Sequence, residues 1–206
     1  MGKDVAVLLV NPSKNPLGVD RRLENEADPI RRRMLKEVRF HIAIEATCEV
    51  DPAIARLAPE CAYVLYDHST QPVTIVGKSN IRAHFYEALF DRIDPRLEWD
   101  IVNCWCDGRA VITEGIQKSL VHGHVLRAEG FDVDPDGKYL QNARHLVIWP
   151  FDDQVRLIGE TVYFGFSQPS EEVAKCKVEE DQIGTFEGQI VEPGSEAMHF
   201  MDRAPA

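Results

Sequence analysis

The sequence lacks any apolar run that approaches the roughly 18 residues of a membrane-spanning helix. A short apolar run, Val5–Val10, follows Lys3 and Asp4, and no small-residue cleavage site comes after it. We therefore expect neither a membrane span nor a signal peptide. A basic surplus is also missing, because 34 Asp and Glu outnumber 23 Lys and Arg for a formal net charge of −11. Nucleic-acid binders normally carry a basic footprint, so this balance argues against such a partner.

A disulfide framework is absent as well. Cysteine occurs five times, an odd number, at positions 48, 61, 104, 106 and 176. Free thiols are typical of a reducing compartment, so the sequence predicts a cytoplasmic protein. Cys104 and Cys106 share one face of a predicted strand, where small buried side chains are a better interpretation than a metal pair. Phosphate-binding glycine loops and Gly-x-Ser-x-Gly elbows do not occur.

The 206 residues fit one domain with flanking segments. Residues 1–27, with Pro12, Pro16, Gly18 and many charges, are expected to form an N-terminal arm rather than a core element. Residues 28–167 carry the periodic patterns of a folded domain. Residues 168–206 hold nine acidic and three basic side chains, so this extension accounts for 9 − 3 = 6 of the 11 net negative charges. We expect it to lie along the domain or a neighbouring subunit.

Helix signals come first and strand signals follow. Asp28-Pro29 is a helix start, and apolar residues at helical spacing continue it to about Glu49. Further helices are predicted over 51–57 and 80–93. Strands are predicted over 61–68, 74–76, 97–106, 110–124, 139–151 and 155–166. This order predicts an α+β fold with three helices packed on a curved, mainly antiparallel sheet.

Three local features carry a family resemblance across residues 30–166. They are Tyr66-Asp67-His68 before the helix that begins at Gly77, the pair Phe85-Tyr86 inside that helix, and the closing hairpin over 147–163. In this order the sequence resembles the superfamily of nuclear transport factor two, ketosteroid isomerase and the SnoaL-like polyketide cyclases. The resemblance implies a cone-shaped α+β barrel with a deep apolar pocket. It also implies a lyase, dehydratase or isomerase that needs no cofactor and no metal.

The resemblance implies four catalytic candidates. Asp67 falls where the isomerases place their general base, and partial burial at a strand end would raise its pKa. Tyr86 falls where they place an oxyanion-binding tyrosine, although their partner tyrosine aligns near Ala43. His145 lies one same-face step from the second oxyanion position, and an imidazole there could act near neutral pH. His122 lies near the catalytic histidine of scytalone-type dehydratases.

Six further residues are predicted to contact substrate. Strand alternation places Glu114 beside Ile112 and Ile116, and Glu160 among apolar neighbours, on faces that align with the pocket. An ion pair between strands is the alternative for both carboxylates. The other candidates share strand or helix positions near the aligned pocket: Tyr63, Asp100, Phe85 and Trp149. His41 and Glu45, four apart on the first helix, are expected to form an ordinary helix pair.

The substrate implied is a hydrophobic, aromatic or polycyclic small molecule, such as a lignin-derived diarylpropane, a polyketide or a steroid-like compound. A non-catalytic binding or assembly module of the same fold is the alternative, since the fold alone does not fix function. A metal-dependent cupin is a weaker alternative. It would use His122 and His124, but glycine spacings and element order do not fit it.

The outer sheet face predicts self-association into a homodimer or homotrimer. It would expose Leu146, Ile148, Leu157, Thr161 and Tyr163. Contiguous apolar patches of more than a few hundred Å² usually mark an interface.

Overall fold

Helices pack on one face of a curved sheet in the computed structural model, which describes residues 7–66 and 71–194. The helices are η1 (Pro12–Lys14), α1 (Leu17–Glu24), α2 (Pro29–Glu45), α3 (Asp51–Arg56), α4 (Lys78–Ile81), η2 (Arg82–Glu87), α5 (Ala88–Arg92), α6 (Gly123–Ala128), α7 (Ser170–Val173) and η3 (Glu180–Gln182). The strands are β1 (Ala62–Tyr66), β2 (Val73–Val76), β3 (Ile93–Cys106), β4 (Ala110–His122), β5 (Lys138–Pro150), β6 (Gly159–Ser167) and β7 (Lys177–Val178).

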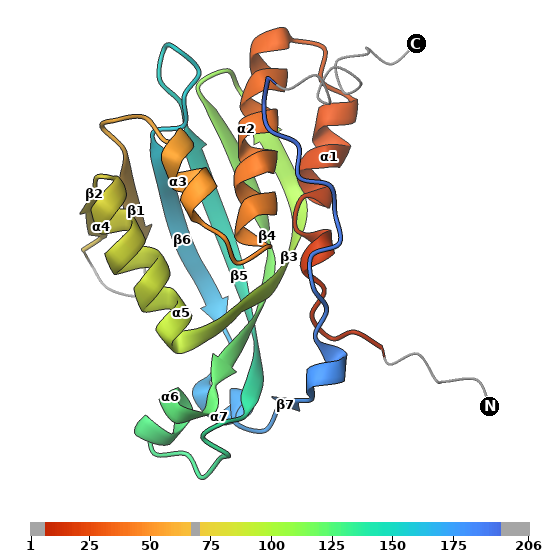
Figure 1. The fold of residues 1–206 in the computed structure, drawn as a ribbon, viewed down its shortest axis with the longest axis vertical. Helices are drawn as coiled ribbons and strands as arrows, with labels where there is room; N and C mark the ends of the chain where they lie inside the picture. The colour runs from red at the N-terminus through yellow and green to blue at the C-terminus, as the bar shows by residue number, and fades with distance from the viewer. Residues whose placement is uncertain (1–6, 67–70, 195–206) are drawn as a thin grey trace, which may run out of the picture.

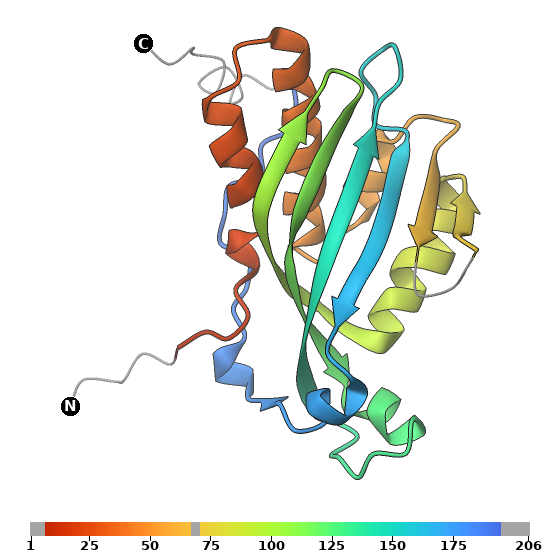
Figure 2. The same cartoon turned by 180° about the vertical axis from the view of Figure 1, so that it is seen from behind.

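The seven strands form a single sheet in the order β2-β1-β6-β5-β4-β3, with β7 beside β5. β1 and β6 are parallel, and the other pairs are antiparallel. Figure 1 shows α2, α3 and the α4–α5 segment in front of this sheet, and Figure 2 shows its opposite face without a helical layer. The predicted α+β class is confirmed. The sheet is curved but open at β2 and β3, so it is not the closed barrel that the resemblance implied.

α2 is the central helix of the layer, and its start follows from local chemistry. Asp28 Oδ1 accepts hydrogen bonds from the Ile30 and Arg31 amides, each at 2.9 Å, and Pro29 supplies the first turn. The apolar stripe predicted from the sequence is buried. The helix ends at Glu45 rather than near Glu49, and Cys48 adopts a left-handed φ of 67° just beyond it.

α1 lies in the segment expected to be an arm, yet it packs against β3 as a core element. Val19 and Leu23 are buried in the main core cluster. A Cβ on Gly18 would come within 2.4 Å of the Ile101 side chain, so glycine is what lets this helix approach the strand. A short amphipathic helix framed by prolines has too little periodicity for the sequence to predict it.

The faces of β4 are the reverse of the predicted assignment. Thr113 is fully buried on the helix side, whereas Ile116 is exposed on the outer face together with Glu114, two residues along the same strand. Both faces of this strand contain apolar residues, so alternation alone could not tell inside from outside.

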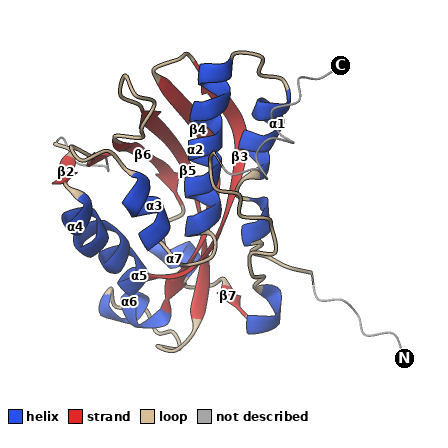
Figure 3. Ribbon diagram, turned by 45° about the horizontal axis from the view of Figure 1, so that its top comes forward, coloured by secondary structure: helices blue, strands red, loops and turns tan. Residues whose placement is uncertain are grey.

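α6 replaces the end of the predicted fourth strand. It starts at Gly123, so His122 and His124 lie at a strand–helix junction and their rings stack with centroids 5.4 Å apart. The cupin interpretation required both histidines on one strand and is wrong. Figure 3 shows α6 and α7 near one end of the sheet.

The described part of the C-terminal extension lies along the domain, as expected. β7 pairs with β5, and Val178 and Ile183 are buried. Ile183 forms an isolated parallel bridge with Val10, so this segment also holds the start of the described chain. No helix among the described residues is both long and apolar enough to cross a membrane.

Candidate active site

A pocket of about 220 Å³ lies between the sheet and the η2–α5 segment. Its apolar walls include Phe85, Phe90, Leu97, Trp99, Trp149 and Phe164. Polar side chains that reach it include Glu45, Tyr86, His145, Glu160, Gln117 and Gln141. The volume is just below the range of about 300–1,000 Å³ typical of drug-sized ligands. The pocket therefore suits a small, mostly apolar molecule with a few polar groups.

The aromatic pair of this pocket comes from a turn of π-helix. η2 follows directly on α4 and carries Phe85 and Tyr86. Single π-helical turns occur frequently at functional sites because they re-aim side chains. Here Phe85 and Tyr86 both line the pocket, and their rings meet edge to face at 4.9 Å.

One wall of the pocket covers a buried hydrogen-bonding network centred on His41. Its Nε2 atom lies 3.1 Å from the hydroxyl oxygens of Tyr63 and Tyr86. Those two hydroxyls are 3.1 Å apart, and Tyr86 donates to Glu45 Oε1 at 2.5 Å. Glu160 Oε1 lies 3.2 Å from the same imidazole nitrogen. α2, β1, η2 and β6 thus bring five polar side chains together.

Two carboxylates determine the charge on His41. Burial disfavours the imidazolium, but Glu45 and Glu160 outweigh it and raise the pKa of His41 to about 10. Burial also raises the pKa of Glu160, against the opposing effect of the His41 charge. Both shifts favour a proton held inside the network. We assign this proton to His41, because a positively charged imidazolium offsets the negative charges of the two buried carboxylates and a neutral ring would not.

The two tyrosines serve as hydrogen-bond donors. Burial, reinforced by the neighbouring carboxylates, raises the pKa of Tyr63 and of Tyr86 well above the usual value. Both hydroxyls therefore keep their protons at neutral pH. Tyr86 lines the pocket, whereas Tyr63 is fully buried and contacts it through Tyr86.

His145 lies further along the pocket on β5. Burial lowers its pKa to about 4, so the ring is neutral at physiological pH. It is 8% exposed and packs edge to face on Phe164, with centroids 4.9 Å apart. Neither ring nitrogen has a hydrogen-bond partner among the described residues. Because His145 lines the pocket, its ring nitrogens can bond to water or to a ligand there.

Six of the ten predicted site residues reach the pocket or its network. Tyr86, His145, Glu160, Phe85 and Trp149 line the pocket, and Tyr63 joins the network behind it. Asp67, the predicted base, lies outside the described residues.

Three other candidates do not reach this pocket. Glu114 is on the outer face, where hydrogen bonds from Asn103 and then Arg144 to its carboxylate lower its pKa. Asp100 is exposed, because its position on β3 points away from the helices. His122 is half-buried, and its Nε2 lies 3.3 Å from the Phe90 carbonyl oxygen.

The sequence interpretation misses the roles of His41 and Glu45, which it treats as an ordinary i,i+4 pair. Their positions continue the apolar stripe of Val38 and Ile42, which is the signal that they face inward. Polar residues on a buried helix face need partners, and these come from strands far away in the sequence.

The same groups could hold a metal ion. His41, Glu45 and Glu160 each offer one ligand atom, and these atoms lie within 4.8 Å of one another. Imidazole and carboxylate ligands suit zinc and similar divalent ions. The hydroxyl of Tyr86 already bonds Glu45 and lies 3.1 Å from His41, so a metal would have to displace this arrangement.

Comparison with known proteins supports the fold. No model of a known protein family matches the sequence, and no curated protein is similar to it. A solved structure from Jannaschia sp. CCS1, described as a SnoaL-like polyketide cyclase, aligns with a TM-score of 0.51 and 16% identity over 69% of this chain and 90% of its own. A protein from Xanthomonas campestris, described as a polyketide cyclase, aligns with a TM-score of 0.52 and 19% identity over 71% and 98%.

A third neighbour, an NTF2-like protein from Burkholderia pseudomallei K96243, has a TM-score of 0.51 and 13% identity over 71% of this chain and 98% of its own. Together with the helices on a curved mixed sheet, these alignments identify the fold as NTF2-like. Identities this low show a shared fold only, so the reaction has to be argued from the site itself.

Proposed function

We propose that this protein is a cofactor-independent enzyme that moves protons on a hydrophobic, aromatic small molecule. Lyase, dehydratase and isomerase reactions all begin with such a step. The observation that carries the proposal is a buried carboxylate–imidazole–tyrosine network that opens into an apolar pocket. Strongly perturbed titratable groups that meet at a cleft are characteristic of functional sites.

Glu160 is our choice for the general base. It lines the pocket, and burial raises its pKa above the usual value even though His41 Nε2 lies 3.2 Å from its Oε1 atom. A carboxylate with a raised pKa is a stronger base than an ordinary one. The base would remove a proton from a substrate carbon, and the electron pair would move toward a substrate oxygen.

His145 would stabilise that oxygen, and Tyr86 would join it by turning its hydroxyl hydrogen away from Glu45 Oε1. Both side chains are neutral at neutral pH, and both line the pocket. Fixed donors in a dry site stabilise developing negative charge strongly. Return of the proton to another carbon gives isomerisation, and departure of a leaving group gives elimination. Tyr63, His41 and Glu45 would position the base and the donor.

Hydrogen exchange at carbon tests the reversible proton removal that is the proposed first step. The protein would be incubated in D₂O with a panel of hydrophobic aryl ketones, whose α-hydrogens can leave as protons and be replaced, and deuterium uptake at carbon followed by NMR. We expect uptake with part of the panel, and a loss of about 10²-fold or more in Glu160→Gln. Glu171→Gln, the same change on exposed α7, is the matched control. No uptake with any compound, or full uptake in Glu160→Gln, contradicts the proposal.

A metal-dependent reaction is the second candidate, favoured by the convergence of His41, Glu45 and Glu160. Metal analysis of the purified protein and dialysis against a chelator distinguish the two. The cofactor-independent proposal predicts unchanged exchange after chelation. Lost exchange that returns with one added divalent ion would support the metal instead.

A further inference from the structure

The far end of the pocket carries a second group of polar side chains. Along the inner faces of β4 and β5, the register pairs Thr113 with Val147, Gly115 with His145, Gln117 with Ala143 and Ser119 with Gln141. On β6, Thr161 pairs with Ile148, which places Glu160 at the level of Trp149. The lining of the pocket therefore changes along its length. The Glu160 carboxylate lies at one end, apolar side chains follow, and the amides of Gln117 and Gln141 lie with the Ser119 hydroxyl at the other end.

Gln117, Ser119 and Gln141 have donor and acceptor atoms without hydrogen-bond partners among the described residues. Gln117 Nε2 donates to Ser119 Oγ at 3.1 Å, which leaves the Gln117 carbonyl oxygen and the Ser119 hydroxyl hydrogen unused. The Gln141 amide has no hydrogen-bond partner among the described residues. All three side chains line the pocket, and Ser119 is only 7% exposed. Donors and acceptors that converge without partners in a half-closed space are suited to a ligand.

The two polar ends are too far apart for a one-ring molecule. Six residues of β5 separate the level of Glu160 from that of Gln117, which is about 20 Å of strand. The stretch between them is lined by Val147, Val162 and Phe164. Two aromatic rings joined by a short linker would fill it. His145 lies in this stretch, where a substrate oxygen could meet its neutral ring.

The far end favours a neutral group over a charged one. Arg92 is the cation among the described lining residues, and its guanidinium lies 3.7 Å from the Glu129 carboxylate. Amide and hydroxyl groups donate and accept at once, which matches a phenol or alcohol better than a carboxylate.

We propose that Gln117, Ser119 and Gln141 form a binding subsite for a neutral hydroxyl group on the distal ring of a two-ring substrate. This inference rests on the proposed function for its reactive end, but the subsite itself concerns binding alone. It would fix the substrate along the pocket so that only one end meets Glu160.

Binding of non-reacting probes tests the subsite. The probes are bibenzyls with a para hydroxyl on both rings, on one ring or on neither, and one with a hydroxyl and a para carboxylate. Binding is followed by quenching of tryptophan fluorescence, since Trp99 and Trp149 line the pocket. We expect the monohydroxy probe to bind about 3–10-fold more tightly than the probe without a hydroxyl. Gln117→Leu/Gln141→Leu should reduce this ratio to about one.

Two controls keep the outcome decisive. Gln154→Leu, on the exposed β5–β6 turn, should keep the wild-type ratio. If the double variant does not fold, side-chain amide signals of Gln117 and Gln141 in the wild type should shift with the monohydroxy probe but not with the probe that lacks hydroxyls. Equal affinities, a ratio unchanged in the double variant, or tighter binding of the carboxylate would overturn the inference. Because binding needs no turnover, a hydroxyl preference without hydrogen exchange would refute the proposed function alone.

Discussion

His41 holds a positive charge in a place where an isolated imidazolium would be too costly. Glu45 Oε1 and Glu160 Oε1 lie 3.6 and 3.2 Å from its Nε2 atom. Taking charges out of water costs several kcal/mol per ion in real proteins, and mutual attraction offsets this only with good geometry. Such an arrangement is weak evidence for stability. Its position against a pocket makes positioning of the base the better explanation.

The protonation of His41 gives stability a defined pH dependence. The pKa rises from 6.5 to about 10 on folding, so between these values the native state keeps a proton that the unfolded state has released. The contribution is complete below pH 6.5 and is lost as pH rises toward 10. The raised pKa of Glu160 acts in the same direction. We expect the free energy of unfolding, measured in urea, to fall by at least about 1 kcal/mol across this window.

Two variants separate His41 from the other titrating groups. His41→Gln should reduce the slope of stability against pH, whereas His124→Gln, on exposed α6, should not. A slope that is unchanged in His41→Gln would contradict a buried imidazolium.

At the scale of elements, the approach of β1 to β6 depends on one glycine. Gly159 opens β6 with φ at +134°, and a Cβ there would lie 1.8 Å from the Ala62 carbonyl oxygen. No L side chain fits this position without moving one of the two strands. Glu160 follows directly, so the same contact also fixes the level of the proposed base.

Gly159→Ala should therefore destabilise the protein by more than the roughly 1–2 kcal/mol that a left-handed conformation costs by itself. Gly108→Ala is the matched control, because it has φ at +96° with nothing within 4 Å of the added carbon. Urea unfolding compares the two. Equal losses in the free energy of unfolding would contradict the prediction that the close contact between β1 and β6 requires glycine at position 159.

Elements with strong periodicity were predictable, and relations between elements were not. The helix over Pro29–Glu45 and most of the strands follow from spacing and turn residues. The sequence could not choose the inner face of β4, because Ile112 and Ile116 mimic a buried face. This is why Glu114 was assigned to the wrong face, whereas Glu160 on β6 was assigned to the pocket correctly. The His41 network joins four separate elements, so its partners became visible only in three dimensions.

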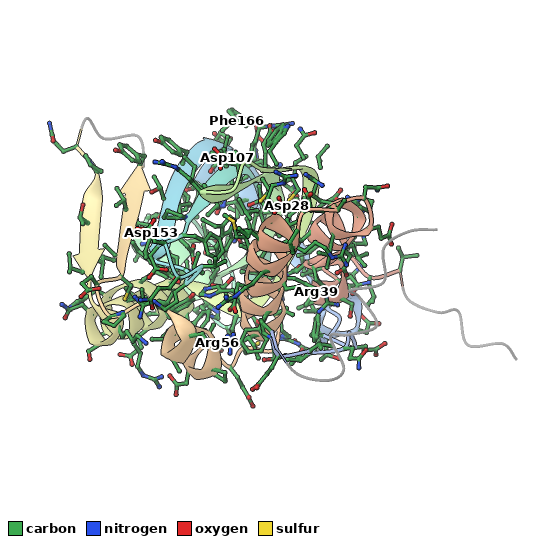
Figure 4. All side chains as sticks on the ribbon, turned by 90° about the horizontal axis from the view of Figure 1, so that it is seen from above. Asp28, Arg39, Arg56, Asp107, Asp153 and Phe166 are labelled. Atoms are coloured by element: carbon green, nitrogen blue, oxygen red, sulfur yellow. The ribbon has the colours of Figure 1, made fainter. Side chains whose placement is uncertain are left out.

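At the scale of the molecule, the sheet face opposite the helices (Figure 2) carries exposed aromatic side chains. Figure 4 shows Phe166 on the side of the sheet away from α2 and α3, where it is 75% exposed. Tyr66 and Tyr163 stack nearby, with ring centroids 4.6 Å apart. Leu157, which the sequence assigned to this face, is buried instead.

We propose that this face pairs two or three copies of the chain. Sedimentation at micromolar concentration should show a dimer or trimer for the wild type. Tyr163→Lys should shift the equilibrium toward monomer, since a charge there opposes apolar contact. A monomeric wild type would rule out this assembly.

The C-terminal extension should contribute to stability within one chain. Ile183 pairs with Val10, and Glu180 bonds Arg96 and Lys138, which fastens η3 to β3 and β5. A chain that ends at Ser170 loses all of these contacts. Its melting temperature should be lower than that of the full chain by several degrees. An equal melting temperature would mean that the extension is not held.

The proposed function places the general base, Glu160, in the pocket network. The most direct test compares deuterium uptake at carbon in Glu160→Gln with uptake in Asp67→Asn, using the same aryl substrate and protein concentration. Our account predicts a loss of about 10²-fold or more in Glu160→Gln and a smaller loss in Asp67→Asn. The opposite order would contradict it and make Asp67 the base.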